Sequence, residues 1–351
     1  MNKKKVIIII SIVLLIIFII ILSLLLSKNN KTYAIGDTLA DTVIAQSKGD
    51  TWNAGDSGVY YTNNHEYRYI GANVNNYVSF NDDLYRIIGV FDSNSHGQEG
   101  KILVKLIRSR ILGSYSWGAY NTGNTLETYS NYGNDWTGVT TGVKANLNVL
   151  LNEYFYNKTD NSSTYGSCSS WTYYYNNTNY RTNDCTDIVG YGIDAILQNY
   201  IEEVTWYLYG YSSTGLSKQN FYLCERGQYS GCTSANSGAY ATSTNAKIGL
   251  MYVSDYMYAS GYFNSTSTTT GSSYYFGNQN WLYKGYEWTI MPGSNSTTNA
   301  FYVYSNGIVY SIYAYNGYGA RPTFYLKSSV YVTGGSGTFD DPYTISCDDC
   351  N

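Results

Sequence analysis

The sequence predicts an α+β fold in which a twisted antiparallel sheet carries two helices and a loop-rich face. Short runs of β-branched and aromatic residues, separated by Asn, Asp and Gly, are typical of strands and turns. Two longer stretches place apolar residues three and four positions apart, which indicates helices. Near the C-terminus, Asn306-Gly307 stands between two strand-like runs and predicts a hairpin. An apolar run at the N-terminus adds a transmembrane helix to this fold class.

The 351-residue chain begins with a basic tail, residues 1–5, and an apolar run, residues 6–26, that only Ser11 and Ser23 interrupt. At about 1.5 Å per residue this run spans about 30 Å, the thickness of the hydrocarbon core of a bilayer. We therefore expect a single-pass membrane helix with the C-terminal domain outside the cell. A cleaved signal peptide is the alternative, although its apolar region is usually only about 7–15 residues long.

After this run we expect a polar stalk over residues 27–57, a single extracellular domain over residues 58–346, and a short tail, residues 347–351. Residues 1–31 hold five of the 21 Lys and Arg and no acid, so the remainder carries 16 bases against 25 acids. An acidic domain attracts neither phosphate groups nor anionic lipid headgroups. We therefore expect no nucleic-acid partner, and contact with the membrane only through the anchor.

The first strands of the sheet are expected between residues 60 and 107. The runs that carry the strand pattern are Glu66–Ile70, Tyr77–Phe80, Leu84–Val90 and Lys101–Ile107. Asn81-Asp82-Asp83 joins the second run to the third and is a good hairpin connector. The strand pattern returns at residues 246–253.

Two apolar stripes predict the helices. The first, about three turns long, consists of Val143, Leu147, Leu150, Leu151 and Tyr154. The second consists of Ile193, Ile196, Leu197, Tyr200, Ile201, Val204 and Leu208. For the second helix, Asp184 or Thr186 would serve as N-cap and Gly210 would mark the C-terminal end. We interpret both stripes as faces that pack against the core.

All six cysteines are candidates for disulfide bonds, which fits a location outside the cell. Cys168 and Cys185 bracket one polar loop, and Cys224 and Cys232 bracket a shorter one. A bridge that closes either loop would stabilise the fold by about 2–4 kcal/mol, although four cysteines permit three pairings. For Cys347 and Cys350 we favour a short disulfide or a frayed tail over a redox or zinc pair.

Folding the chain about Asn306-Gly307 pairs Ser305 with Ile308. This register places one set of side chains on the core face: Phe301, Val303, Ile308, Tyr310 and Ile312. It places another set on the opposite face: Tyr302, Tyr304, Val309, Ser311 and Tyr313. The opposite face is rich in aromatic rings and amides, which bind by stacking and adaptable hydrogen bonds. The predicted ligand-binding residues are Tyr302, Tyr304, Tyr313, Tyr315, Asn316 and Tyr318.

Several C-terminal motifs are shared with a known fold. They are Glu287-Trp288-Thr289-Ile290, Asn299–Val303, Ser305-Asn306-Gly307 and the Gly-x-Arg-Pro-x-x-x-Leu ending of Gly319–Leu326. Together they resemble the C-type-lectin-like fold of formylglycine-generating-enzyme-like domains and of the variable proteins of diversity-generating retroelements. Upstream segments near residues 69–90, 203–208, 222–227 and 249–256 resemble a group of membrane-anchored surface proteins of Gram-positive-type bacteria.

The resemblance implies a C-type-lectin-like domain over most of residues 60–345. It does not imply calcium-dependent sugar binding, because the loop and strand motifs of those lectins are absent. It does not imply formylglycine-generating activity either, because no cysteine stands between Trp288 and Leu326. The only histidines, His65 and His96, leave little for histidine-based catalysis or a multi-histidine metal site. We therefore expect no catalytic residue, no metal and no cofactor.

The first functional hypothesis is a cell-surface binding or adhesion module that is not an enzyme and that contacts an extracellular protein or glycan through the tyrosine face of the hairpin. An extracytoplasmic enzyme of the formylglycine-generating type is the second hypothesis. A structural component of the cell envelope, whose tyrosines pack against neighbouring copies, is the third.

Overall fold

The computed structural model describes residues 37–118, 133–142, 144–170, 172–175, 179–182, 184–261 and 279–350. Among these residues no helix is long and apolar enough to cross a bilayer, so the expected transmembrane helix is not supported. The run 6–26, on which that expectation was based, lies outside the described residues. The compact unit begins at Thr38 rather than at residue 58, because Leu39 and Val43 of helix α2 (Leu39–Ile44) are completely buried in its core.

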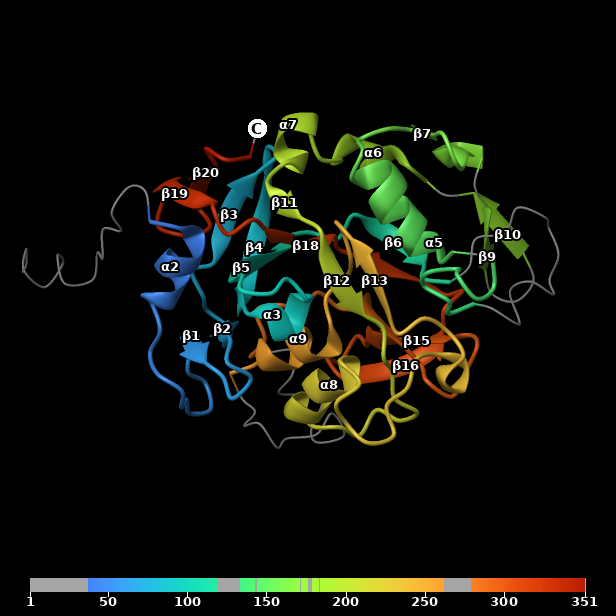
Figure 1. The fold of residues 1–351 in the computed structure, drawn as a ribbon, viewed down its shortest axis with the longest axis horizontal. Helices are drawn as coiled ribbons and strands as arrows, with labels where there is room; N and C mark the ends of the chain where they lie inside the picture. The colour runs from blue at the N-terminus through green and yellow to red at the C-terminus, as the bar shows by residue number, and fades with distance from the viewer. Residues whose placement is uncertain are drawn as a thin grey trace, which may run out of the picture. The chain divides into compact units, whose positions relative to one another are not determined.

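A seven-stranded sheet forms one half of this unit and lies in the left part of Figure 1. Its strand order is β1-β2-β4-β5-β18-β11, with β3 also paired to β4, and every pair is antiparallel. The strands are β1 (Gly58–Tyr61), β2 (Tyr67–Ile70), β3 (Tyr77–Phe80), β4 (Asp83–Phe91), β5 (Leu103–Arg108), β11 (Ile201–Glu202) and β18 (Thr323–Leu326). The four predicted runs of residues 66–107 are confirmed as β2 to β5. The connector is confirmed too, since Asn81 and Asp82 both have positive φ, as a two-residue type I′ turn requires.

A five-stranded sheet lies beside it, in the order β16-β15-β14-β17-β6. Its strands are β6 (Gly113–Ser116), β14 (Glu287–Pro292), β15 (Asn299–Val303), β16 (Val309–Tyr313) and β17 (Gly317–Ala320). The pair β14–β17 is parallel. The predicted fold class, one antiparallel sheet with two helices, is therefore wrong: the described chain is mixed α and β, mostly sheet, with two principal sheets and several short helices.

The remaining elements are short. The helices other than α2 are α3 (Ser93–His96), α5 (Asn146–Val149), α6 (Thr186–Gly190), α7 (Ala195–Gln198), α8 (Lys218–Glu225) and α9 (Val253–Tyr258), with 3₁₀ turns at Cys168–Ser170 and Asn236–Gly238. Four two-stranded pairs are β7 (Asn161–Ser162) with β8 (Gly166–Ser167), β9 (Thr172–Tyr175) with β10 (Asn179–Thr182), β12 (Val204–Tyr207) with β13 (Ser243–Ala246), and β19 (Tyr331–Gly334) with β20 (Thr344–Ser346).

The first apolar stripe is confirmed as a helix from Leu147 to Tyr154, whereas its first member, Val143, lies outside the described residues. Helix α5 continues without a break into a π-helical segment, Leu150–Phe155. Leu147, Leu150, Leu151 and Tyr154 are all completely buried. The stripe therefore packs against the core, as its spacing predicts.

The second apolar stripe is not one helix. Only α7 is helical within it, and the chain then forms β11 and β12. Along β12 burial alternates, with Val204 and Trp206 inside, which is the period of a strand. Ile196, an expected core residue, is 74% exposed. The β-branched residues of this stretch satisfied the helical spacing by coincidence.

Gly210 does not end a helix. A Cβ atom at this position would lie 2.0 Å from the carbonyl oxygen of Pro292, so only glycine permits the two backbones to pass at this distance.

The predicted disulfides are confirmed. The bridges join Cys168 to Cys185, Cys224 to Cys232 and Cys347 to Cys350. Three disulfides fit an extracellular protein, because such bonds persist in oxidising surroundings.

Candidate functional site

The hairpin that carries the predicted site has a register one residue away from the expected one. Tyr302 pairs with Tyr310 and Val303 with Val309, and the backbone N–H of Tyr304 donates to the carbonyl of Ile308. The turn therefore holds three residues, Ser305 to Gly307, and of these only Gly307 has positive φ. This is the three-residue hairpin loop that ends in a left-handed residue.

A shift of one residue exchanges the faces of a strand. On β16, Tyr310 and Ile312 now share a face with Tyr302, whereas Tyr313 lies on the other face with Phe301. The predicted grouping of Tyr302, Tyr304 and Tyr313 on one face is therefore wrong. Tyr302 is also buried, at 4% exposure, while Tyr313 is half exposed and stacks on Tyr315 with ring centroids 5.1 Å apart. Asn316 lies in the turn after β16 and is partly exposed.

Aromatic rings nevertheless gather on one face of the five-stranded sheet. We call this group the tyrosine platform: Tyr286, Trp288, Tyr302, Tyr304, Tyr310 and Tyr318. Tyr302 stacks on Tyr318 at 4.8 Å, and Tyr318 stacks on Tyr286 at 5.1 Å. Trp288 lies completely buried beneath them. Four neighbouring strands of the sheet, β16, β15, β14 and β17, each contribute one ring: Tyr310, Tyr302, Trp288 and Tyr318. Tyr286 lies just before β14, and Tyr304 lies just after β15.

The platform presents both apolar rings and hydroxyl groups to solvent. Tyr286 and Tyr310 are 39% and 43% exposed, and Tyr304 and Tyr318 are partly exposed. Hydrogen bonds from Ser305 and Tyr304 lower the pKa of Tyr286. The bond between Tyr304 and Tyr286 in turn raises the pKa of Tyr304. Burial, together with the neighbouring Tyr318, raises the pKa of Tyr302. The hydroxyl of Tyr286 is therefore linked to that of Tyr304, and the hydroxyl of Tyr302 to that of Tyr318.

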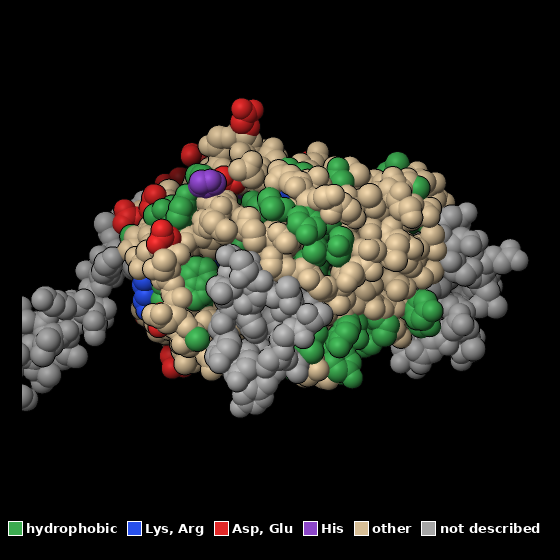
Figure 2. All heavy atoms as spheres, turned by 90° about the horizontal axis from the view of Figure 1, so that it is seen from below, with side chains coloured by type: hydrophobic (Ala, Val, Ile, Leu, Met, Phe, Trp, Pro, Cys, Tyr) green, Lys and Arg blue, Asp and Glu red, His purple; other side chains and the backbone are tan. Residues whose placement is uncertain are grey.

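Charged side chains are unevenly distributed over the surface of the protein. Figure 2 shows the protein from below, the side toward which β15 and β16 lie in Figure 1. Hydrophobic side chains, tyrosine included, gather on the right half of this view, while the charged side chains in view lie mainly on the left.

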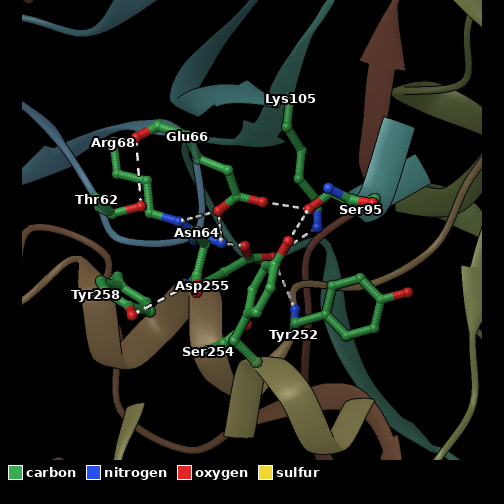
Figure 3. A network of polar contacts seen from close by, with 12 residues as sticks. Thr62, Asn64, Glu66, Arg68, Ser95, Lys105, Tyr252, Ser254, Asp255 and Tyr258 are labelled. Atoms are coloured by element: carbon green, nitrogen blue, oxygen red, sulfur yellow. Dashed lines mark hydrogen bonds and ion pairs between the residues drawn. The ribbon is translucent and has the colours of Figure 1, made fainter. Parts of the chain in front are cut away.

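A second cluster of functional groups is sealed inside the protein (Figure 3). Asp255, on α9, forms ion pairs of 2.6 Å with Lys105 of β5 and 2.9 Å with Arg68 of β2. Arg68 also pairs with Glu66 at 2.7 Å. None of these four side chains is more than 1% exposed. Sequence analysis did not find this cluster, because its members come from strands and a helix far apart in the chain.

The cluster continues through α3 and α8. Ser95 donates to Glu66 and accepts a hydrogen bond of 2.9 Å from Arg226, which also forms an ion pair with Glu225. Glu225 in turn accepts hydrogen bonds from the backbone N–H and the hydroxyl of Ser254. Polar and charged groups on or next to α3, α8 and α9 are therefore tied to β5 and to the start of β2.

Burial sets the charge states in this cluster. Burial opposes ionisation of Asp255, but Lys105 and Arg68 more than offset this effect and keep its pKa below the usual value. Burial lowers the pKa of Lys105 to about 8 and raises that of Glu225 to about 7. These values are typical of reactive groups, yet no solvent reaches the side chains, so a substrate cannot contact them. We interpret the cluster as the structural link between the helices and the seven-stranded sheet.

Helices α8 and α9 were not predicted, although each has a recognisable start. The hydroxyl of Ser217 caps α8 by accepting from the backbone N–H of Asn220. Asp255, in the first turn of α9, accepts from the backbone N–H of Tyr252. These are the cap signals that could have revealed both helices.

One cleft, with a volume of about 450 Å³, lies between the α5 region and β13. Polar side chains line most of it, including Asn148, Asn152, Glu153, Glu203 and Lys247. Asn152 donates to the carbonyls of Ile248 and Asn148, and Asn148 donates to that of Trp136. These amides therefore join neighbouring segments of the chain.

The histidines lie apart. His65 is exposed and its Nδ1 lies 2.8 Å from the hydroxyl of Tyr61. His96 is completely buried. Within the described ranges, no three or more His, Cys, Asp or Glu side chains form a group that could hold a metal ion.

In comparisons with known proteins, no family model, no curated protein and no solved structure matches this chain.

Proposed function

We propose that this chain is an extracellular binding module that holds a protein ligand on the tyrosine platform. The observation that carries the proposal is the platform itself, in which four partly exposed tyrosine rings pack with the buried Tyr302 over a buried tryptophan. Rigid tyrosines give large amphipathic contact area at a small cost in side-chain entropy. A monomeric protein gains nothing in stability from leaving such rings in water.

The composition of the platform favours a protein over a glycan. Ser305, Asn306 and Gly307 follow Tyr304 in one turn, and Asn316 and Gly317 precede Tyr318 in the next. Tyr, Ser, Asn and Gly are the residues that antibody paratopes use most, because small polar residues adapt their hydrogen bonds around the fixed rings. The faces of Tyr302 and Tyr318 are already stacked on each other, so they offer edges and hydroxyls rather than the open ring faces on which sugars stack.

The test uses the full-length oxidised chain, immobilised and panned with a phage library of random peptides. The double variant Tyr286→Ala/Tyr310→Ala removes the two most exposed rings of the platform. The control, Ile196→Ala/Phe339→Ala, removes two exposed apolar side chains outside it. Peptides enriched on the wild type should bind the platform variant at least about tenfold more weakly, or about 1.4 kcal/mol, and should bind the control unchanged.

Equal binding to both variants would refute the platform as the binding face. The same proteins applied to a glycan array give the competing outcome: selective glycan binding, with no peptide enriched, would replace the protein ligand by a sugar.

A further inference from the structure

The sequence contains two Asn-Gly pairs, Asn306-Gly307 and Asn316-Gly317, and both lie next to strands that carry the tyrosine platform. The first pair is in the turn between β15 and β16, and the second connects the turn after β16 to the start of β17. An asparagine side chain reacts most readily with the backbone when glycine follows it, because glycine has no Cβ to block the approach. The two pairs have the same chemistry but different hydrogen bonds.

The reaction of such a pair requires two groups to be free. The backbone nitrogen of the glycine loses its proton and attacks the side-chain carbonyl carbon of the asparagine, which closes a succinimide ring and releases ammonia. Water then opens the ring at either carbonyl and leaves aspartate or isoaspartate. Overall, one amide and one water molecule become one carboxylate and one ammonium ion. A hydrogen bond to either group slows ring closure, because it must break first.

At Asn306 both groups are held by hydrogen bonds. The N–H of Gly307 donates to the carbonyl of Tyr304 at 2.9 Å, and the side-chain oxygen of Asn306 accepts from the N–H of Ile308 at 3.1 Å. Gly307 is also buried. The three-residue loop therefore protects this pair, although the side chain of Asn306 is exposed.

The N–H of Gly317 points away from β6. The N–H of Gly319 donates to the carbonyl of Tyr286, just before β14. Because backbone groups alternate along a strand, the N–H of Gly317 points to the same side as that of Gly319. It therefore does not bond to Ser116, its neighbour on β6. On the side to which it points, β14 begins only at Glu287, opposite Gly319, so Gly317 lies beyond the end of that strand.

Among the described residues, no group accepts from the N–H of Gly317, and none bonds to the side-chain amide of Asn316. The backbone N–H of Asn316 donates to Tyr313, but this bond involves neither reacting group. Asn316 and Gly317 are both partly exposed, so water reaches them. Both requirements of the reaction are therefore met at the second pair and neither is met at the first.

We propose that Asn316 is a self-modification site, at which the backbone nitrogen of Gly317 displaces ammonia from the side chain and water leaves aspartate or isoaspartate in its place. The reaction needs no enzyme and no reagent other than water. Residue 316 therefore gains a negative charge as the protein ages, two positions before Tyr318 of the platform, while Asn306 keeps its amide. The effect of this charge on ligand binding rests on the proposed function, whereas the modification itself does not.

The experiment is incubation of the full-length oxidised chain at mildly alkaline pH, followed by chymotryptic digestion and mass spectrometry of the peptides that contain residues 306 and 316. In the folded protein, Asn316 should deamidate at least about tenfold faster than Asn306, because two hydrogen bonds protect Asn306. The matched control is the same chain, reduced and unfolded in guanidinium chloride. There both pairs lose their hydrogen bonds and should react at similar rates.

The variant Asn316→Gln identifies the reacting side chain. It keeps an amide at this position, but its longer side chain must close a larger ring, so residue 316 should stay unmodified over the same period. A folded wild type in which Asn316 keeps its amide, or reacts no faster than Asn306, would overturn the proposal. The same preference for Asn316 in the unfolded chain would also overturn it, because the neighbouring residues and not the fold would then select the site. The mass is measured without any ligand, so a failure of the proposed protein ligand is a separate result.

Discussion

The Nζ of Lys105 lies 2.6 Å from a carboxylate oxygen of Asp255, in a part of the protein that water does not reach. A buried ion pair adds little net stability, but the loss of one partner leaves a charge without compensation. Asp255→Asn should therefore lower the free energy of unfolding by about 3–5 kcal/mol, as measured by urea denaturation.

The matched control is Asp194→Asn, which breaks the ion pair of Asp194 with Lys158. These side chains are 50% and 40% exposed, and the pair is 2.5 Å long. Exposed pairs contribute about 0–1 kcal/mol. Similar losses from both variants would show that the Asp255 cluster is not a structural link.

Truncation of Tyr302 and of Tyr310 should have opposite consequences, although the two residues are cross-strand partners. Tyr302 is 4% exposed, and Tyr302→Ala should cost about 3–5 kcal/mol, as large buried aromatic residues do. Tyr310 is 43% exposed, and Tyr310→Ala should change stability by about 0.5 kcal/mol or less. Urea denaturation of both variants in dilute solution measures these two changes in the free energy of unfolding. If Tyr302→Ala were as stable as the wild type, the register of the hairpin would be incorrect.

The disulfides should differ in their contributions. The bridge between Cys168 and Cys185 closes a loop with a sequence separation of 17, and that between Cys347 and Cys350 one of 3. The chain-entropy relation gives about 3 kcal/mol for the first and about 2 kcal/mol for the second. Replacing each pair with serine and comparing thermal unfolding tests this order. The reverse order would mean that the contacts around Cys347 and Cys350 matter more than loop closure.

His96 should make the protein less stable in acid. Its Nε2–H donates to the carbonyl of Phe91 and its Nδ1 accepts from the backbone N–H of Gln98, so the neutral ring is fully bonded. Burial lowers its pKa to about 4, and the bond to Phe91 offsets only part of this effect. Between pH 6.5 and 4 the unfolded chain binds a proton that the folded chain does not, so stability falls as the pH falls.

The measurement is urea denaturation of the wild type and His96→Gln between pH 7.5 and 4. The wild type should lose about 3 kcal/mol more than the variant over this range. Glu225, whose pKa burial raises to about 7, has the opposite effect on stability, but it is present in both proteins and cancels in the difference. Parallel pH profiles would contradict the buried neutral state of His96.

Local patterns in the sequence predicted strands β2 to β5, the turn at Asn81-Asp82 and the disulfides, because each depends on neighbouring residues. The hairpin shows where local signals are insufficient. Asn-Gly fits both a two-residue and a three-residue loop, and here the side chain of Asn306 accepts from the N–H of Ile308 while Gly307 alone has positive φ. The choice moves each side chain of one strand to the other face, so the predicted site mixed residues from both faces.

The prediction from the second apolar stripe was wrong, and the charge cluster was not predicted, for a different reason. Ile201 belongs to a strand because it pairs with Leu326, and Asp255 is buried because Lys105 and Arg68 face it. These partners lie far away in the sequence, and a periodic pattern or a single acidic residue does not reveal them. The tyrosines were recognised as a surface, but their stacking on Trp288 depends on four strands meeting.

The charge cluster also determines when the chain can fold. Arg68 and Lys105 emerge early during synthesis, and their partner Asp255 follows 187 and 150 residues later. Arg68 can pair early with Glu66, but Asp255 is the only ion-pair partner of Lys105 among the described residues, so until it is made β5 cannot be buried over an unpaired charge. Closure of such distant contacts is slow. We therefore expect the seven-stranded sheet to assemble late and in one step, after α9 has been made, so that a chain truncated before residue 255 should stay unfolded.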